Sequence, residues 1–486
     1  MKILSRASSL ARLQTALVER ALRESHPDLD IETLTRTSAG DQDQTSPLWK
    51  LPNKGAFTAD LSESLIAGDA DIVVHSFKDL PIDMPAGTRI AGALPRADAR
   101  DLVLIKRAVI DRRPESLRIL SSSPRRAWLL GDVLPSLLPW RTRSIEAVPV
   151  RGNIETRLRK LIEGEEHGLV MAKAAIDRLL GFGAPFEREA ATVRERLQHC
   201  RWMLMPMREF PWAPAQGAIA IEIASGREDL ERLIEPIASA QTMRAVEAER
   251  QVLAEHGGGC HQALGAAILE RPYGRVVSVR SRDTRTERWE LERSGPAFPR
   301  AAAAQLWPEP GSTITAARAS LGVEPPSASG YWIARAEALP DTWTVSADTI
   351  VWAAGSQTWK RLAQREVWVN GCADGLGDDE RPPVDDLAGG TVSWVRLTHD
   401  RAPLADSLAT YRVDTILPDD LPERTHFFWM SGELFKRAVE RWPAIRHAWH
   451  ASGPGHTRET IRAELGASDR IGVWLDRASW ERDVCL

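Results

Sequence analysis

The chain has 486 residues, too many for one hydrophobic core, so we expect three or four domains. Its net charge of −4 and sequence pI near 6.3 argue against a nucleic-acid or anionic-membrane partner. The first residues lack the apolar core of a signal peptide, and no uncharged run reaches the roughly 18 residues of a membrane span. We therefore expect a cytoplasmic protein that does not contact a membrane.

Helical and strand patterns alternate through the first half of the chain. Leucines at helical spacing predict a helix from Ser8 to Ser25, and Asn153 and Gly164 are typical caps of a helix over 154–163. Another helix is predicted over 58–67, and strands are predicted over 31–36, 70–75, 117–120 and 169–172. This alternation favours doubly wound α/β domains with mainly parallel sheets.

The composition changes near the middle of the chain. Most of the 18 tryptophans lie beyond residue 280, and the stretch 322–330 is rich in Pro, Ser and Gly, as linkers are. Beyond it, the passages 348–362 and 425–438 each read as a strand, a turn of small residues and a helix start. Each is followed by a second strand that ends in glycine. This duplication predicts two similar α/β lobes joined by a hinge.

Seven cations of the first half lie at or near predicted strand ends and helix starts, where ligands of α/β proteins gather. They are Arg6, Lys54, Lys78, Arg125, Arg126, Arg151 and Arg157. Such a set suits a ligand with several carboxylates or phosphates. One carboxylate, Asp79, lies among them, and an ionised carboxylate there suits the stabilisation of a developing positive charge or a proton relay.

Four motifs of the first half resemble the porphobilinogen deaminase (hydroxymethylbilane synthase) family. They are His75-Ser-Phe-Lys78-Asp79-Leu-Pro81, Arg151-Gly-Asn-Ile-Glu-Thr-Arg157-Leu, Ala215-Gln216-Gly-Ala, and the Gly-Gly-Gly-Cys260 loop. They occur in the family's order and at similar spacing over about residues 1–320. No single motif is specific, but the ordered set is.

The resemblance implies two periplasmic-binding-protein-like lobes and a small α+β domain that carries the cofactor cysteine. Mapped onto this chain, lobe 1 spans 1–97 and 218–236, lobe 2 spans 98–217, and the cofactor-cysteine domain spans 237–321. We expect a linker over 322–330 and a bilobal α/β domain over 331–486.

The resemblance also implies the activity, in which four porphobilinogen molecules are joined into hydroxymethylbilane with release of ammonia. A dipyrromethane cofactor would be bound covalently through Cys260, and no metal is expected, because no histidine–carboxylate cluster is present. The implied site residues are Asp79 and Lys78 for catalysis; Cys260, Arg125, Arg126, Ser123 and Lys54 for the cofactor; and Arg6, Ser8, Arg151, Arg157 and Gln216 for the substrate. We expect a monomer whose only partner is the small-molecule substrate.

The sequence departs from the family pattern at several loop positions. Pro124 stands where leucine is usual before the paired arginines, and Asn53 and Ala215 each replace a common glycine. Gln262-Ala263 replaces the usual Val-Pro after the cysteine. These changes concern loop geometry and leave the charged residues in place.

The second half resembles uroporphyrinogen-III synthases, in which a strand leads into a Ser-containing turn and a later Gly-Pro-x-Thr turn starts a helix. Ser431, Ser452, Gly453 and Thr457 match that order, with one extra residue in the second turn. The implied activity is cyclisation of hydroxymethylbilane to uroporphyrinogen III. Two alternatives stay open: a synthase-like domain without activity, and a non-catalytic polycarboxylate-binding protein, which would leave Asp79 and Cys260 unexplained.

Overall fold

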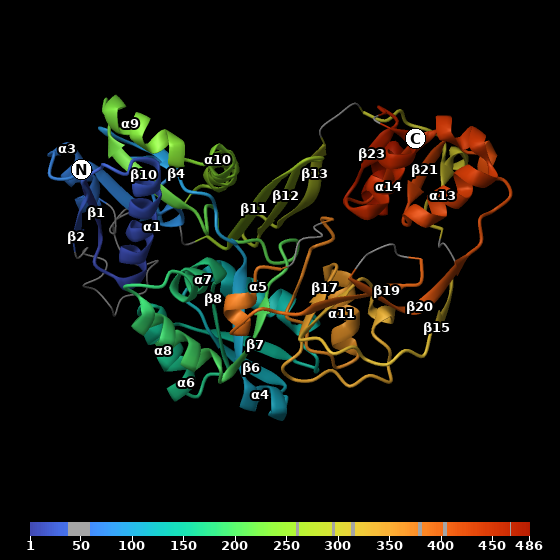
Figure 1. The fold of residues 1–486 in the computed structure, drawn as a ribbon, viewed down its shortest axis with the longest axis horizontal. Helices are drawn as coiled ribbons and strands as arrows, with labels where there is room; N and C mark the ends of the chain where they lie inside the picture. The colour runs from blue at the N-terminus through green and yellow to red at the C-terminus, as the bar shows by residue number, and fades with distance from the viewer. Residues whose placement is uncertain are drawn as a thin grey trace. The chain divides into compact units, whose positions relative to one another are not determined.

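The computed structural model describes residues 1–36, 59–258, 262–293, 297–312, 316–377, 382–401, 406–466 and 468–486. The chain forms two compact units, each of mixed α/β structure (Figure 1). The first unit comprises Met1–Leu269, Ser278–Arg288 and Asp385–Gly390. The second comprises Glu270–Val277, Trp289–Val384 and Thr391–Leu486. Among the described residues, no helix has both the length and the apolar character needed to cross a membrane.

The first sheet of unit 1 has the strand order β2-β1-β3-β10-β4. β1 (Lys2–Arg6) pairs in parallel with β2 (Glu32–Arg36) and β3 (Ile72–Ser76). β10 (Ile219–Ala224) runs antiparallel to both β3 and β4 (Thr88–Ala93). Figure 1 shows the green β10 beside the blue strands, so the chain returns to this sheet after building another one.

The second sheet of unit 1 has the order β7-β6-β8-β5-β9. β6 (Ser116–Leu120) is parallel to β7 (Ser144–Val148) and β8 (Gly168–Ala172). β5 (Asp101–Lys106) is antiparallel to β8 and β9 (Cys200–Leu204). Four strands of each of these sheets therefore run in the same direction, as expected for mainly parallel sheets, and β10 or β5 runs against them. β5 and β10 run antiparallel because each is the first strand after the chain crosses from the other sheet, with no helical crossover before it.

The predicted helix boundaries in this unit are set by their caps. The side chain of Ser8 accepts a hydrogen bond at the start of α1 (Ser9–Ser25). Asn153 accepts from Thr156 N at 2.8 Å at the start of α6 (Ile154–Glu163), which ends at Gly164 as expected. The other described helices of the first half are α3 (Ala59–Ile66), α4 (Arg107–Arg112), α5 (Pro124–Val133), α7 (Lys173–Gly181), α8 (Glu187–Leu197), α9 (Glu228–Ile234) and α10 (Ala240–Glu255).

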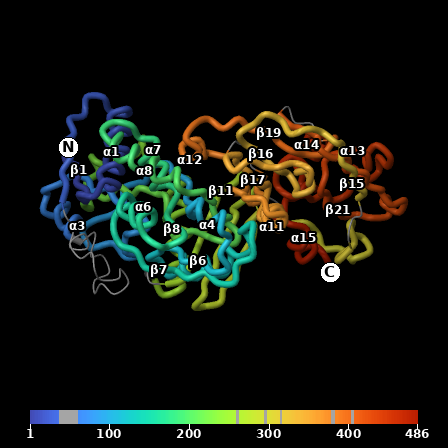
Figure 2. The backbone as a smooth tube through the Cα atoms, turned by 90° about the horizontal axis from the view of Figure 1, so that it is seen from below, coloured from blue at the N-terminus to red at the C-terminus, as the bar shows by residue number. Residues whose placement is uncertain are grey.

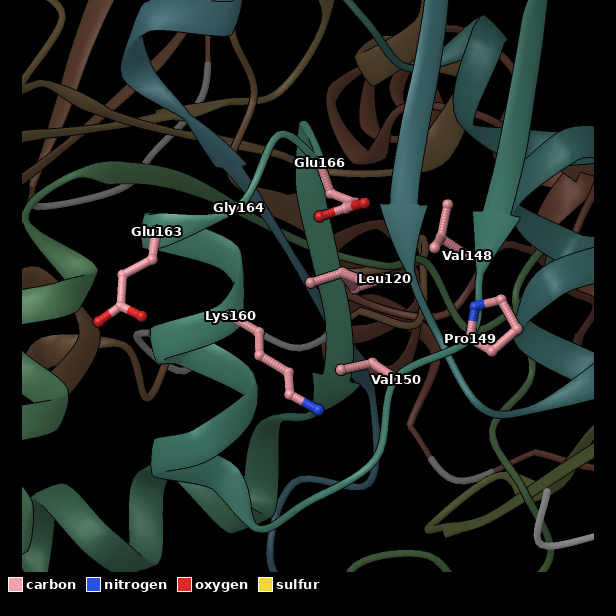
Figure 3. Close-up of a pocket in the computed structure, with 8 residues that line it drawn as sticks. All are labelled: Leu120, Val148, Pro149, Val150, Lys160, Glu163, Gly164 and Glu166. Carbon is pink, nitrogen blue, oxygen red and sulfur yellow. The ribbon is translucent and has the colours of Figure 1, made fainter. Parts of the chain in front are cut away.

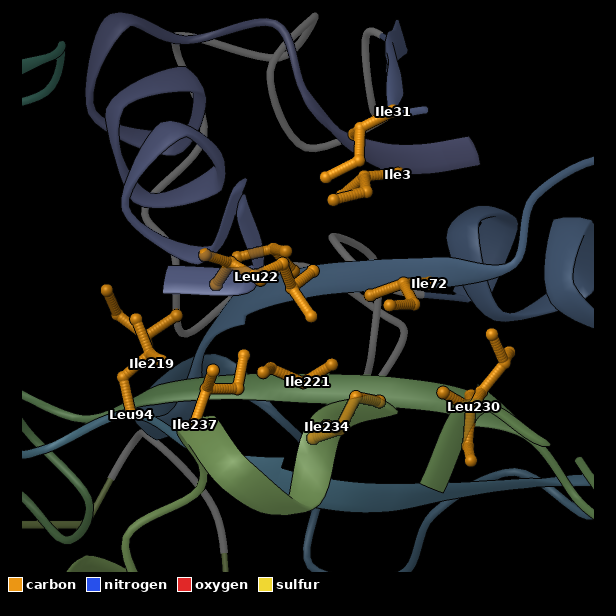
Figure 4. Packing of buried hydrophobic residues seen from close by; sticks show 13 residues of the cluster. Ile3, Leu22, Ile31, Ile72, Leu94, Ile219, Ile221, Leu230, Ile234 and Ile237 are labelled. Carbon is orange, nitrogen blue, oxygen red and sulfur yellow. The ribbon is translucent and has the colours of Figure 1, made fainter. Parts of the chain in front are cut away.

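The core of the first sheet joins distant parts of the chain. Ile3 and Ile72 pack with Ile219 and Ile221 of the returning strand and with Leu22 of α1, all of them buried (Figure 4). Burial of such side chains contributes roughly 1.5–3 kcal/mol each, so the return of the chain is part of the stability of this lobe. On its other side, α1 lies beside α7 of the second lobe (Figure 2), where Arg20 Nη2 donates to the carbonyl of Phe182 at 3.3 Å.

A three-stranded sheet follows, with β11 (Leu264–Arg271), β12 (Gly274–Ser281) and β13 (Thr286–Arg293) in that order. The second unit then contains two further sheets. The four-stranded sheet is wholly parallel and comprises β14 (Leu306–Trp307), β21 (His426–Trp429), β22 (Trp449–Ser452) and β23 (Ile471–Val473). The six-stranded sheet has the order β15 (Ala316–Ser320), β20 (Ser407–Thr415), β19 (Trp394–His399), β16 (Gly330–Ile333), β17 (Ile350–Ala353) and β18 (Gly371–Cys372).

The duplicated passages form the predicted strand–turn–helix units. β17 leads into α11 (Ser356–Gln364), and β21 leads into α13 (Gly432–Arg441). The remaining helices of the second half are α12 (Asp385–Ala388), α14 (His456–Leu465) and α15 (Arg477–Val484). The strands of these two strand–turn–helix segments, β17 and β21, belong to different sheets, which confirms a bilobal α/β second half.

The structure differs from the expected boundary between the halves. β14 and β15 lie within the range expected for the cofactor-cysteine domain, yet they pair with β21 and β20 of the second half. Trp307 is buried against Trp429, with ring centroids 4.9 Å apart. The second half therefore begins before the Pro/Ser/Gly stretch, because its parallel sheet needs β14 as an edge strand.

Candidate active site

Lys78 and Asp79 lie in a short 3₁₀ turn, Phe77–Asp79, directly after β3. Buried Phe77 anchors the turn, because its N–H donates to the carbonyl of Ala218 at 3.1 Å. Asp79 is exposed, whereas Lys78 is half-buried and its Nζ donates to Gln216 Oε1 at 3.3 Å. Burial, and then the charge of Arg126, lower the pKa of Lys78 to about 8. This places the ammonium close to the pH range of proton transfer.

A fully buried carboxylate, that of Asp101 in β5, organises the paired arginines. One of its oxygens, Oδ2, lies 2.7 Å from Nη1 of Arg125, and the other, Oδ1, accepts from Nε and Nη2 of Arg126 at 2.9 and 2.6 Å. Burial opposes the ionised form, but the charges of Arg125 and Arg126 outweigh it and hold the pKa of Asp101 well below its usual range. Asp101 is not among the site residues that the sequence predicts. Its only sequence signal is an acidic residue at the start of the apolar run 102–105.

Gln216 connects this network to Lys78. Its amide nitrogen donates to the carbonyl of Ala99 at 2.8 Å and to Asp101 Oδ1 at 2.9 Å, while its oxygen also accepts from Arg126 Nη2 at 3.2 Å. The side chain is 1% exposed, so the described structure places it beneath the surface of the site. A substrate contact by Gln216 stays a prediction.

Ala215, which stands where the family commonly has glycine, adopts a backbone conformation that is unfavourable for alanine. Ala215 has φ of +64°, in the left-handed region that favours glycine and costs other residues roughly 1–2 kcal/mol. Its N–H donates to Glu249 Oε2 at 2.8 Å, which holds the turn. The substituted loop therefore keeps the conformation of a glycine turn.

Arg151 and Arg157 flank the first turn of α6. Arg157 Nε donates to the carbonyl of Gly152 at 2.8 Å. Burial, followed by the charges of Arg126 and Arg151, lowers the pKa of Arg157 to about 10, while the charge of Asp79 raises it. The structure thus brings Asp79, Arg126, Arg151 and Arg157 within electrostatic range of one another.

The serines predicted for the site are helix caps. Ser8 Oγ accepts from Ala11 N at 3.4 Å, and Ser123 Oγ accepts from Arg126 N at 3.4 Å. Pro124 occupies the first turn of α5, where its missing N–H costs nothing, so this departure from the family is compatible with the helix start. Arg6 is the last residue of β1, two positions before Ser8.

Two predicted residues, Lys54 and Cys260, lie outside the described residues. The helix that precedes Cys260 in the chain, α10, contributes a second residue that the sequence does not predict. Glu249 is fully buried and accepts from Arg96 Nη1 and Nη2 at 2.8 and 2.7 Å, and from Trp212 Nε1 at 2.8 Å. It therefore ties α10 to both segments by which the chain crosses between the lobes.

A depression of about 370 Å³ lies elsewhere on the second lobe (Figure 3). It is bounded by α6, which contributes Lys160 and Glu163, and by the ends of β6 and β7, which contribute Leu120 and Val148. None of the predicted site residues lines it. Within the described residues, no group of three or more His, Cys, Asp or Glu side chains is placed to hold a metal ion.

In the second half, the structure places the predicted residues at the starts of two helices. Ser431 Oγ accepts from Leu434 N at 3.4 Å as the N-cap of α13. Ser452 ends β22 and is buried. Gly453 follows it in the turn to α14, and Thr457 lies in the first turn of α14. Both turns follow neighbouring strands of the parallel four-stranded sheet, so they lie at the same edge of it.

Comparison with known proteins gives a consistent set of relatives for the first half. Residues 1–232 match the family model described as "Porphobilinogen deaminase, dipyromethane cofactor binding domain". The chain is 34% identical over 270 residues to a porphobilinogen deaminase from Clostridium novyi, covering 55% of this chain and 83% of that protein. It is 36% identical over 272 residues to one from Burkholderia orbicola, covering 56% of this chain and 74% of that protein.

Among solved structures, the chain is similar to the periplasmic VFT2 domain of Bordetella pertussis BvgS, with 10% identity and a TM-score of 0.25. The match covers 53% of this chain and 92% of that one. An arginine-transport periplasmic binding protein from Legionella pneumophila is also similar, with 10% identity, a TM-score of 0.25 and coverage of 53% and 94%.

Proposed function

Because this chain belongs to the porphobilinogen deaminase family, we propose that it joins four porphobilinogen molecules head to tail into hydroxymethylbilane. Each addition breaks the bond from the aminomethyl carbon to nitrogen, releases ammonia, forms a carbon–carbon bond to the terminal pyrrole of the growing chain and removes a proton from that ring. One water molecule then supplies the hydroxyl group of the released product. The observation that carries the proposal is the buried network in which Asp101 and Gln216 hold Arg126 and Lys78 beside Asp79.

The charges of the described site suit the dipyrromethane cofactor. The described site brings five cations near two carboxylates, those of Asp79 and Asp101, so its positive charge exceeds its negative charge; the cations are Lys78, Arg125, Arg126, Arg151 and Arg157. A group that brings an acetate and a propionate on each pyrrole would supply the missing negative charge. Arg125, Arg126, Ser123 and Lys54 would hold it, with Cys260 as the point of attachment. When bound, it supplies the primer to which the substrate units are added.

The chain's own residues then have separate tasks. The carboxylate of Asp79, exposed at the end of β3, stabilises the positive charge that develops on the substrate pyrrole as ammonia leaves, and it can hold the proton that is released. Arg151 and Arg157, together with Arg6 and Ser8, bind the carboxylates of the substrate. Lys78, whose pKa is near 8, can donate or accept a proton beside Asp79.

For the second half, the proposed reaction is cyclisation of hydroxymethylbilane to uroporphyrinogen III. Two observations support this proposal. The second half contains two strand–turn–helix units, and Ser431 and the 453–457 turn lie at the same edge of a parallel sheet. The reaction also consumes the product of the first half, so the two activities would be consecutive.

Product analysis of the purified full chain tests both halves. Given porphobilinogen, the protein should release type III uroporphyrinogen. Only the type I isomer, which forms spontaneously from released bilane, would contradict the activity of the second half and leave a synthase-like domain without catalysis. No bilane at all, together with an intact mass lacking two added pyrrole units, would favour a non-catalytic polycarboxylate-binding protein.

A further inference from the structure

Two glycines of the second unit meet without side chains between them. A Cβ on Gly377 would lie 2.4 Å from the nitrogen and 2.6 Å from the Cα of Gly455, distances that real side chains do not reach. Gly377 (φ +76°) follows β18 of the six-stranded sheet, and Gly455 (φ +104°) lies in the turn between β22 of the four-stranded sheet and α14. The loop 373–377 of one lobe therefore touches the 453–457 turn of the other, backbone against backbone.

The ring of Tyr273 adjoins both sides of this contact. Tyr273 lies between β11 and β12, within the segment Glu270–Val277 that belongs to the second unit, and it is 8% exposed. Its hydroxyl donates to the carbonyl of Leu376 at 2.7 Å, next to Gly377. The guanidinium of Arg458, in the first turn of α14, lies 5.7 Å from the centre of the Tyr273 ring. One side chain thus contacts the loop of one lobe and the helix start of the other.

The position of Tyr273 is held by its own turn. The next residue, Gly274 (φ +137°), lies so close to β13 that a Cβ there would be 2.3 Å from the carbonyl oxygen of Glu292. Leu376 is 3% exposed, and two backbone hydrogen bonds hold its loop. Gly375 N donates to the carbonyl of Ala354, the residue after β17, at 2.8 Å, and Leu376 N donates to the carbonyl of Ala373 at 3.1 Å. A hydrogen bond between two such restricted partners fixes one relative to the other.

We infer that Tyr273 is a positioning residue for the second half: it holds the 373–377 loop against Gly455 and so closes the two lobes over the 453–457 turn. The inference rests on the proposed cyclisation only where it treats the 453–457 turn as part of a reaction site. The contacts of Tyr273 do not depend on that proposal. By sequence, Tyr273 belongs to the expected cofactor-cysteine domain. It lies between the first two strands of the three-stranded sheet, and the first of them, β11, begins four residues after Cys260 in the chain. In the structure, the segment that holds Tyr273, Glu270–Val277, belongs to the second unit.

The test uses the full chain with two variants and a matched control. Tyr273→Phe removes only the hydroxyl, and Tyr273→Ala also removes the ring that Arg458 contacts. The control is Tyr331→Phe, because the Tyr331 hydroxyl also donates to a backbone carbonyl, that of Pro326 at 3.1 Å, elsewhere in the second unit. Hydrogen exchange, followed by mass spectrometry, reports on peptides covering 373–377 and 453–458. The proportion of type III isomer formed from supplied hydroxymethylbilane is measured alongside.

Tyr273→Phe should speed exchange in 373–377 about fivefold, the change expected for the loss of one hydrogen bond. Tyr273→Ala should extend the increase to 453–458 and lower the type III fraction, while the rate of bilane formation stays unchanged. Unaltered exchange at 373–377 in both Tyr273 variants, or an equal increase in the Tyr331 control, would overturn the inference. If the wild-type chain makes no type III isomer, the proposed cyclisation fails, and the exchange result still decides whether Tyr273 holds the loop.

Discussion

Asp101 binds Arg126 through a single carboxylate oxygen, which accepts from Nε at 2.9 Å and from Nη2 at 2.6 Å. The other oxygen faces Arg125 at 2.7 Å, so one buried carboxylate forms ion pairs with two buried guanidinium groups. It also lies at the first residue of β5, just after the chain crosses between the lobes. The positions of Arg125 and Arg126 therefore depend on the segment by which the chain crosses between the lobes, because that segment places Asp101.

Replacement of Asp101 tests this dependence. Asp101→Asn leaves two buried arginines without a counter-charge and should lower the free energy of unfolding by about 3–5 kcal/mol. It should also reduce cofactor content, measured by intact mass. The control is Asp132→Asn, which removes a largely exposed partner of Arg280 and should cost about 1 kcal/mol or less. If urea unfolding showed the same decrease in the free energy of unfolding for both variants, the role of Asp101 would be contradicted.

Asp79 should matter for turnover and not for folding, because it is exposed. Asp79→Asn should reduce the rate of bilane formation about 10²–10⁴-fold with an unchanged unfolding midpoint, since an amide neither stabilises the cation nor carries the proton. Asp83→Asn, an exposed carboxylate of the same loop, should behave as wild type. Near-normal turnover of cofactor-loaded Asp79→Asn would remove Asp79 from the catalytic step.

The cofactor should be attached only to Cys260. Cys260→Ser should abolish the adduct, because a hydroxyl is a far weaker nucleophile than a thiol near neutral pH. Cys200 is buried, and burial raises the pKa of its thiol to about 12, so it should not react. The sharpest control is Cys485→Ser, which changes a partly exposed free thiol and should keep the adduct. A dipyrromethane mass on the Cys485 peptide would contradict the assignment.

His450 should make the second half sensitive to acid. Its Nδ1 accepts from Trp429 Nε1 at 3.0 Å and its Nε2–H donates to the carbonyl of Ile445 at 2.9 Å, so both nitrogens are used by the neutral ring. Burial lowers the pKa of His450 to about 4. The unfolded state, with a pKa near 6.5, then binds more protons, so stability is complete above about pH 6.5 and falls as the pH drops toward 4.

At pH 5 the free energy of unfolding should be about 2 kcal/mol lower than at pH 7, from 1.36 kcal/mol per pKa unit. Urea unfolding followed by tryptophan fluorescence measures it, because most tryptophans lie in the second half. His450→Gln should be less stable at pH 7 and lose this slope. His447→Gln, at an exposed position, should retain it. A slope that persists in His450→Gln would assign the acid sensitivity to other groups.

Local features of the sequence determined much of the first half. Asn153 and Gly164 set the ends of α6, Ser8 starts α1, and the alternation of helix and strand predicted the fold class. Caps and periodicity depend on neighbours within one or two turns, so they can be read directly. The family motifs likewise predicted Asp79 and Arg157 as site residues, and the position of Arg126 after a predicted strand placed it among the candidate ligand-binding cations.

Only the tertiary structure decided which distant residues meet. Asp101 contacts Gln216, which is 115 positions away in the chain, and β14 joins a sheet whose other strands begin at His426. Tyr273 reaches Leu376 across 103 positions. These contacts depend on where the chain crosses between lobes and on which strand edges remain to be paired. Local periodicity predicts neither the crossing points nor the strand pairing. A buried polar side chain or a short edge strand is stabilised by partners that come from elsewhere in the chain.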